Sequence, residues 1–242
     1  MALIIFYFEA KKNDFYLTAE EYFLRATDND SNYQYQIDNY SKCLIKNPNY
    51  PKAYFKRGNS YLKLFKYENA IDDFTSAIAL DSNVVNDLAY FNRGISYYNI
   101  RKYEDAIADF TISIRMKTDF PDAYYYRGLS NYNIEKYEES FKDYASTVRI
   151  NPDYTEAYFE MAVLCGIYES FFKEIFNLSE AIRIETDSSK SRLDLNYLSR
   201  LYWNRGLAKE NGDYPYYCVD YLRACQNKGD RDYCDQYEIK CN

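Results

Sequence analysis

The chain has 242 residues, a formal net charge of −7 and no histidine. Without histidine it lacks the commonest general base and zinc ligand, and it cannot form a Ser-His or Cys-His pair, so we expect no enzyme, no cofactor and no metal site. Lysine and arginine are interleaved with acidic residues, which argues against nucleic acid as a partner, and no apolar run approaches the roughly 20 residues of a membrane span.

Residues 1–16 begin with the apolar run Ala2–Phe8, which is followed at once by Glu9, Lys11 and Lys12. A signal peptide carries its positive charges before the apolar stretch and small residues at its end, and this segment has neither. We expect a separate N-terminal segment that docks over the first helix pair. A remnant of an export signal and a disordered segment are the two alternatives.

Residues 51–150 hold three copies of one pattern, with Gly58, Gly94 and Gly128 separated by 36 and then 34 residues. A fixed period in this range indicates stacked helix pairs, because one copy cannot bury its own apolar face without a neighbour. Function is therefore expected in a surface and not in a catalytic pocket.

Prolines and tyrosines predict where the helices of these copies begin and end. Pro51 and Pro121 suit the first turn of a helix, where a missing N–H is harmless, and the third copy starts near Asp87. Pro48 and Pro152 follow the preceding helices and stop them. A short polar turn inside each pair precedes a tyrosine: Tyr67, Tyr103 and Tyr137.

Less regular copies lie on both sides of these three. The first, residues 17–50, has a second helix predicted at Tyr33–Lys46 from apolar residues at helical spacing. The fifth has Ala162 in place of the glycine, and the sixth resumes around Gly206 after a polar stretch without period. We therefore expect about six units.

Three divisions of the chain follow from this reading. Residues 1–16 form the N-terminal segment, and residues 17–229 form a repeat array with an inserted loop near 185–198. Residues 230–242 form a C-terminal capping helix that closes the last pair.

The pattern of the second unit is carried by an aromatic residue, a glycine, a tyrosine and small residues around a second aromatic: Tyr54, Gly58, Tyr61, Ala70, Phe74 and Ala77. It resembles the tetratricopeptide repeat, and the resemblance extends from residue 17 to about 228. Asn131 and Ser140 depart from the pattern in the fourth unit. The resemblance implies an all-α fold, a right-handed α-solenoid of about six helix-turn-helix repeats.

An arginine precedes the glycine in four units, and each of those units has an aspartate before its second aromatic. The pairs are Arg57 with Asp73, Arg93 with Asp109, Arg127 with Asp143, and Arg205 with Asp220. The fifth unit has Met161 and Asn177 at these two places. We expect ion pairs between the helices of one unit, with pairing across adjacent units or anion binding as alternatives.

The resemblance also implies that first helices line a concave face and that residues after the buried aromatic point into it. The residues at these places are mainly aromatic and aliphatic: Phe55, Asn59, Phe91, Ile95, Tyr98, Tyr125, Leu129, Tyr132, Phe159 and Trp203. Such a lining suits a peptide segment or partner protein, which makes a non-enzymatic interaction module or scaffold the expected function. Packing between units is the alternative use of these rings. A self-associating structural protein or assembly factor, a homo-oligomer that uses the array ends, is the alternative function.

Four of the six cysteines, Cys218, Cys225, Cys234 and Cys241, lie symmetrically about the turn at residues 228–230. In an antiparallel helical hairpin this symmetry places Cys225 opposite Cys234 and Cys218 opposite Cys241. Two disulfides, four reduced thiols and a zinc site all remain open. The tail resembles cysteine-rich relatives of this repeat found in exported bacterial proteins. We expect a cytoplasmic protein, or an exported one if these cysteines are oxidised.

Overall fold

We describe the chain from a computed structural model, which covers residues 17–28, 32–187, 194–213, 217–228, 234, 237 and 240–241. The segment 1–16 predicted to dock over the first helix pair lies outside these residues. The described residues hold twelve helices and no strand. The expected all-α fold is therefore confirmed.

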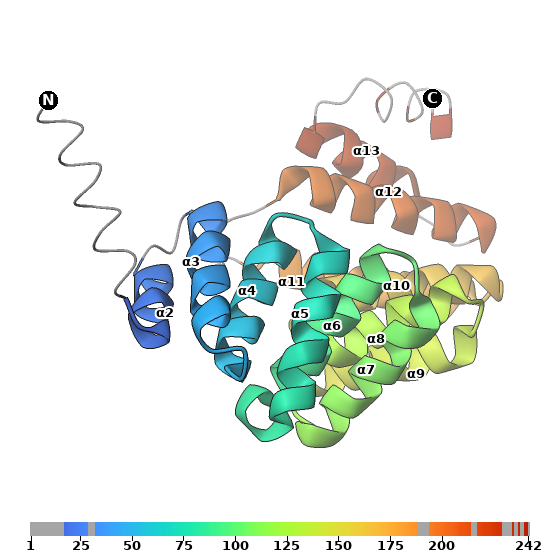
Figure 1. The fold of residues 1–242 in the computed structure, drawn as a ribbon. Coiled ribbons are helices and arrows are strands. Elements are labelled where there is room, and N and C mark those ends of the chain that lie inside the picture. The colour runs from blue at the N-terminus through green and yellow to red at the C-terminus, as the bar shows by residue number, and fades with distance from the viewer. Residues whose placement is uncertain are drawn as a thin grey trace, which may run out of the picture. The chain divides into compact units, whose positions relative to one another are not determined.

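The chain divides into two compact units, residues 1–118 and 119–242, and each is described by itself. Unit 1 contains three helix pairs (Figure 1). Their bounds are α2 (Ala19–Thr27) with α3 (Tyr33–Lys46), α4 (Pro51–Lys63) with α5 (Tyr67–Leu80), and α6 (Ser82–Asn99) with α7 (Tyr103–Met116). The two helices of each pair pack on each other, and α4 also packs on α3 and α6.

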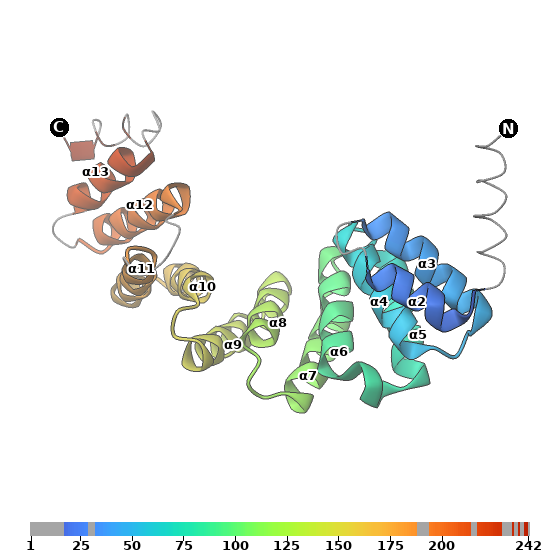
Figure 2. The same cartoon turned by 90° about the vertical axis from the view of Figure 1, so that its left-hand side faces the viewer.

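Unit 2 contains three further pairs, which Figure 2 shows between the green and red parts of the chain. Their bounds are α8 (Pro121–Asn133) with α9 (Tyr137–Ile150), α10 (Thr155–Ile167) with α11 (Phe171–Glu185), and α12 (Leu195–Asn211) with α13 (Tyr217–Lys228). Within this unit α9 packs on α10, and α11 packs on α12. Each unit is thus a stack of three helix pairs, which agrees with the repeat solenoid expected from the sequence.

The predicted helix boundaries are largely confirmed. Pro51 and Pro121 occupy the first turn of α4 and α8, and α5, α7 and α9 begin at the predicted tyrosines. The first helix has a capping box, in which the Glu21 backbone N donates to Thr18 Oγ1 at 3.2 Å and the Thr18 backbone N donates to Glu21 Oε2 at 2.7 Å.

Two boundaries differ from the expectation. α6 starts at Ser82 but contains a break at Asn86, whose φ is 46°, and the backbone N of Leu88 donates to Asn86 Oδ1 at 3.2 Å. The helix that belongs to the third unit therefore follows this break, near the predicted start. α12 begins at Leu195, inside the range predicted as a loop, because Asp194 accepts hydrogen bonds from the backbone of Asn196 and Tyr197 and caps it.

The turn inside four of the pairs is a Schellman motif closed by a residue other than glycine. In the second pair Phe65 has φ 58°, its backbone N donates to Leu62 O at 3.0 Å, and Lys66 N donates to Tyr61 O at 2.9 Å. These are the two hydrogen bonds that define the motif. The left-handed position is held elsewhere by Arg101, Glu135 and Glu169. Each of these side chains carries a conformational cost that glycine would not.

The repeat glycines allow each pair to close around its second aromatic ring. A Cβ on Gly94 would lie 2.7 Å from Cε1 of Phe110, which is fully buried, and a Cβ on Gly206 would lie 2.6 Å from the same atom of Tyr221. Such contacts are impossible without a shift of backbone or ring. The fifth pair, which has Ala162 at this place, has the aliphatic Leu178 in its core instead.

Candidate functional site

In unit 1 the predicted face residues lie on two first helices that pack side by side. Phe55 and Asn59 are on α4, and Phe91, Ile95 and Tyr98 are on α6. All five side chains are half-buried. They are neither sealed inside the array nor fully exposed to solvent, so their role in binding stays a prediction.

The aromatic rings of this face rest on the second helix of their own pair. Phe55 lies 5.9 Å from Phe74 and Phe91 lies 5.7 Å from Phe110, measured between ring centroids. One side of each ring is thus supported from within its repeat, while part of its surface stays open. Support of this kind holds an aromatic side chain in one rotamer without hiding it.

Asn59 has a structural contact that the sequence did not reveal. Asn92 Nδ2 donates to Asn59 Oδ1 at 2.8 Å, which joins α6 to α4. Asn59 also lines a cavity of about 310 Å³ whose other walls include Lys56, Ser60 and Lys63. This end of the face is polar, in contrast to the aromatic part around Phe91.

In unit 2 the predicted residues lie on three first helices. Tyr125, Leu129 and Tyr132 are on α8, Phe159 is on α10 and Trp203 is on α12, and all are half-buried. Tyr125 rests on Tyr144 at 5.8 Å and Trp203 on Tyr221 at 4.5 Å, as in unit 1. Two rings also contact the next repeat: Tyr125 lies 4.9 Å from Tyr154 at the start of α10, and Phe159 lies 6.3 Å from Tyr197 of α12.

The unit 2 face also carries charges that the sequence analysis did not select. Arg200 lies over the ring of Phe159, with its Cζ 4.5 Å from the centroid. Glu160 is half-buried, and desolvation raises the pKa of its carboxyl while Arg200 lowers it. In the described part of the chain no hydrogen bond or ion pair to the Glu160 carboxylate is found. Glu160 directly follows Phe159 in the sequence and Arg200 lies one helical turn before Trp203, and this spacing could have identified both residues.

The pKa of the Tyr125 phenol is affected by the same carboxylates. Burial raises its pKa first, and the carboxylates of Glu160 and Glu156 raise it further. Tyr154 Oη donates to Asp122 Oδ1 at 2.9 Å, so Asp122 already has a donor. Glu156 is exposed. The face of unit 2 therefore combines aromatic rings with carboxylates, a setting that favours a cation, and Arg200 of the chain itself is one cation already held there.

The predicted Arg–Asp pairs form between the two helices of one repeat, in all four units that carry both residues. Each arginine donates through Nε and Nη2 to both carboxylate oxygens, at distances between 2.6 and 3.0 Å: Arg57 with Asp73, Arg93 with Asp109, Arg127 with Asp143 and Arg205 with Asp220. The carboxylates are almost completely buried. Bidentate pairing of this kind is among the stronger polar contacts in proteins.

Three of these arginines also bind the preceding repeat. Nη1 of Arg57 donates to Ser41 Oγ at 2.9 Å, and the same atom of Arg93 and Arg205 donates to Thr75 and Ser179 at 3.0 and 3.1 Å. Tyrosines flank the guanidinium groups, as Tyr54 and Tyr61 do for Arg57. These contacts use the donors of the arginines in holding repeats together, which supports the structural interpretation over anion binding.

The fifth unit replaces this pair by another contact. Met161 and Asn177 are both buried, and Asn177 Nδ2 donates to Cys165 Sγ at 3.7 Å. Joint loss of the arginine and the aspartate leaves no unpaired charge in the core. The repeat at α10 and α11 is therefore compatible with the same fold.

A cavity of about 490 Å³ lies in unit 2, and none of the predicted face residues lines it. Its walls come from α9, from the end of α10 and from the first turn of α11. They are Tyr137, Glu138, Phe141, Lys142, Leu164, Cys165, Tyr168, Ser170 and Lys173. Cys165 is buried, and desolvation raises the pKa of its thiol, so the thiol is the protonated, weakly reactive form.

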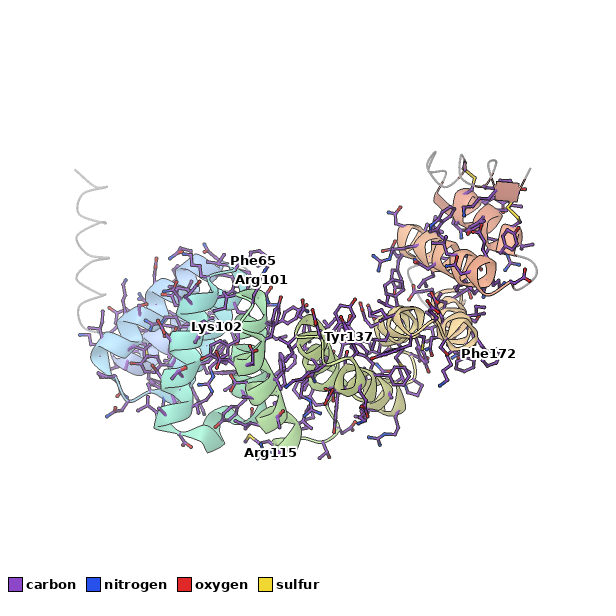
Figure 3. The ribbon with its side chains drawn as sticks, turned by 90° about the vertical axis from the view of Figure 1, so that its right-hand side faces the viewer. Phe65, Arg101, Lys102, Arg115, Tyr137 and Phe172 are labelled. Atoms are coloured by element: carbon purple, nitrogen blue, oxygen red, sulfur yellow. A yellow bond between two sulfur atoms is a disulfide. The ribbon has the colours of Figure 1, made fainter. Side chains whose placement is uncertain are left out.

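The four C-terminal cysteines form two disulfides, Cys218–Cys241 and Cys225–Cys234, drawn as yellow bonds in Figure 3. This is the pairing that the symmetric spacing predicts. Lys240 Nζ also donates to Glu210 Oε2 at 2.7 Å and ties the tail to α12. Residues 234, 237, 240 and 241 are helical, and the rest of the predicted capping helix lies outside the described residues.

Cys43 and Cys165 are free and buried. Across the residues that the structure covers, no group of three or more histidine, cysteine or acidic side chains is placed to hold a metal ion. In the same residues no helix combines the length and the apolar character needed to cross a bilayer.

The tetratricopeptide repeat family matches this chain twice, over residues 51–84 and 91–155. No curated protein matches the sequence.

Several solved structures share the fold. MamA from Desulfovibrio magneticus is 15% identical with a TM-score of 0.67, and the match covers 71% of this chain and 97% of that one. YrrB, described as a protein with an unusual peptide-binding site, is 16% identical with a TM-score of 0.65 over 83% and 97% of the two chains. PilF from Pseudomonas aeruginosa is 15% identical with a TM-score of 0.67 over 92% and 97%. At these identities the likeness concerns the fold alone.

Proposed function

We propose that this chain, which is a tetratricopeptide repeat protein, binds an extended or helical peptide segment of a partner protein on its first helices. Repeats of this family typically act as protein interaction modules and not as catalysts. The peptide-binding site attributed to YrrB is in keeping with such a role, although that protein shares only the fold with this chain.

The proposal rests mainly on the partial exposure of the aromatic rings of the predicted face. Phe55, Phe91, Tyr125 and Trp203 each rest on a ring of their own repeat and keep part of their surface open. Phe55 and Tyr125 also pack against the adjoining repeat, through the cluster that contains Ala89 and through Tyr154, but neither ring is buried by it. Pre-positioned aromatic surface offers a large contact area at a small cost in side-chain entropy, which suits recognition.

The unit 2 face favours a peptide that carries a lysine or arginine next to an apolar residue. The carboxylates of Glu160 and Glu156 are close enough to the phenol of Tyr125 to raise its pKa, so this part of the face is negatively charged. A cation placed there would gain from both carboxylate and ring. The net charge of −7 for the whole chain is consistent with a basic partner.

A selection from a random-peptide phage library on the purified protein tests this function. Selected peptides should be enriched in basic and aromatic residues and should bind the wild-type protein in fluorescence anisotropy. Phe91→Ala with Tyr125→Ala should weaken that binding at least about tenfold, which corresponds to about 1.4 kcal/mol. Equal binding to the double variant would show that the peptides use another surface.

We further propose that the chain works in an oxidising compartment, the alternative to the cytoplasmic location. The two disulfides between α13 and the tail support this, because such bonds persist outside reducing cytosol. Thiol titration of the denatured, non-reduced native protein should find two free thiols, those of Cys43 and Cys165. Six thiols in freshly isolated protein would refute the proposed location.

A further inference from the structure

The cavity between α9 and α11 adjoins an exposed apolar surface. Tyr168, which lines the cavity, is 64% exposed, and on α11 Phe172 and Phe176 are 69% and 56% exposed. Figure 3 shows Phe172 on the outer side of the helices. Phe172 and Phe176 are spaced i and i+4, and Lys173 of the cavity wall is spaced i and i+3 from Phe176, so they share one side of α11. We call Tyr168, Phe172, Phe176 and the cavity the outer patch.

The outer patch exposes more aromatic surface than is usual for a protein surface that contacts only water. Large aromatic side chains exposed next to an apolar hollow mark a place where another chain docks. The cavity of about 490 Å³ is large enough to accept one or two large side chains. Its floor is made by Leu164 and Cys165, both buried.

The charged residues around the cavity indicate which charge a bound segment should carry. Lys142 Nζ is bound to Glu138 Oε1 at 2.7 Å, so these two charges satisfy each other. Lys173 has no ion pair with any residue that the structure describes. An occupant with apolar side chains followed closely by a carboxylate would fill the cavity and pair with Lys173.

The chain itself contains a segment of this composition. Ala2–Phe8 reads ALIIFYF, seven consecutive apolar residues, and Glu9 follows it directly. Such a run left in water would be a liability for a soluble protein, and its large side chains match the size of the cavity. No other apolar run of this length ends in a carboxylate in this sequence.

We propose that Ala2–Phe8 of one copy docks on the outer patch of a second copy, with Glu9 paired to Lys173. The association is heterologous, since segment and patch are different surfaces, so it builds closed rings or open chains of molecules. It uses residues other than those predicted for peptide binding: α10 carries Phe159 of the face near its start, and Leu164 and Cys165 of the cavity near its end.

Sedimentation velocity of the full-length protein over a range of concentrations tests the association. The wild-type chain should form oligomers, and Phe172→Ser with Phe176→Ser, or Ile4→Ser with Phe6→Ser, should leave a monomer with unchanged circular dichroism. Phe65→Ser is the matched control, because Phe65 is 76% exposed but lies in unit 1 outside the patch. A monomeric wild-type protein, or oligomers unaffected by both double variants, would overturn the proposal.

Exchanging the two charges identifies the contact and shows which copy supplies the segment. Glu9→Lys and Lys173→Glu should each weaken association at least about fivefold, and an equimolar mixture of the two variants should recover it. The chain that carries both changes should also associate, because the exchanged charge at position 9 of one copy then meets the exchanged charge at position 173 of the next. Failure of both would remove Lys173 from the contact and with it the proposal.

Discussion

Arg93 and Asp109 form a bidentate ion pair across the two helices of their repeat, at 2.7 and 2.8 Å, and the free Nη1 of the arginine reaches Thr75 in the preceding repeat. One side chain thus connects three helices. Because Asp109 is only 3% exposed, the contact is made in a nearly dry place, where an isolated charge is costly.

We expect Arg93→Met or Asp109→Asn alone to lower the free energy of unfolding by about 3 to 5 kcal/mol, since each leaves its partner uncompensated. The double variant should lose less than either single one. The fifth repeat, with Met161 and Asn177 at these places, is the natural precedent. Urea unfolding followed by circular dichroism measures all three, and a double variant as unstable as the two single losses combined would contradict the pairing.

Gly94→Ala should destabilise the protein by about 1 to 3 kcal/mol through overpacking, because the new methyl group would meet the buried ring of Phe110 at 2.7 Å. Gly166→Ala is the matched change. There the nearest atom is the carboxylate of Glu174 at 3.2 Å, which can move, and alanine is a better helix former than glycine. In thermal unfolding, Gly94→Ala should therefore lower the melting temperature and Gly166→Ala should raise it. Equal effects of the two changes would mean that the ring of Phe110 does not require a glycine at position 94.

Glu135→Gly should raise the free energy of unfolding by about 0.5 to 1 kcal/mol, because Glu135 holds a left-handed conformation with φ 61° that glycine adopts freely. The neighbouring Lys136 has φ −84°, so Lys136→Gly should only add freedom to the unfolded chain and lower stability. Chemical denaturation of the two variants distinguishes them. Destabilisation by both would show that the side chain of Glu135 contributes more than its backbone strain costs.

The half-buried Glu160 makes stability depend on pH. Desolvation raises the pKa of its carboxyl in the folded state, so the folded protein binds this proton more tightly than the unfolded chain. The resulting stability is full below the unfolded pKa and is lost as pH rises through the folded one. Glu160→Gln should thus unfold at higher denaturant than wild type at neutral pH and match it in acid. If the difference in stability between the two proteins instead grew as the pH fell, the pKa of Glu160 would be lowered in the folded state and not raised.

Much of this fold could be predicted from residue spacing. Proline and tyrosine positions gave the starts of α4, α5, α7, α8 and α9, because each residue acts through local backbone geometry. The Arg–Asp pairs could be inferred from the joint absence of both residues in the fifth unit. The two disulfides followed from symmetric spacing about one turn, although the sequence left their oxidation open.

Other features depend on packing that the sequence does not display. The capped start of α12 at Leu195 depends on Asp194, and a polar stretch around it had favoured a loop. The cavity at Tyr137 and Lys173 arises where three helices leave space, which no periodicity records. The charge beside Phe159 was missed because the positions chosen for the face were those of aromatic and aliphatic residues. Binding by the ten predicted face residues stays a prediction.

A comparison of two rings within one repeat decides whether the face rings serve a partner or the fold. Phe91 is half-buried on α6 and Phe110, which it contacts, is fully buried on α7. Phe110→Ala should cost about 3 to 5 kcal/mol in urea unfolding. Phe91→Ala should cost less than about 2 kcal/mol while weakening binding of a phage-selected peptide at least about tenfold. A loss of stability for Phe91→Ala equal to that of Phe110→Ala, with peptide binding unchanged where the variant is folded, would contradict recognition on this face.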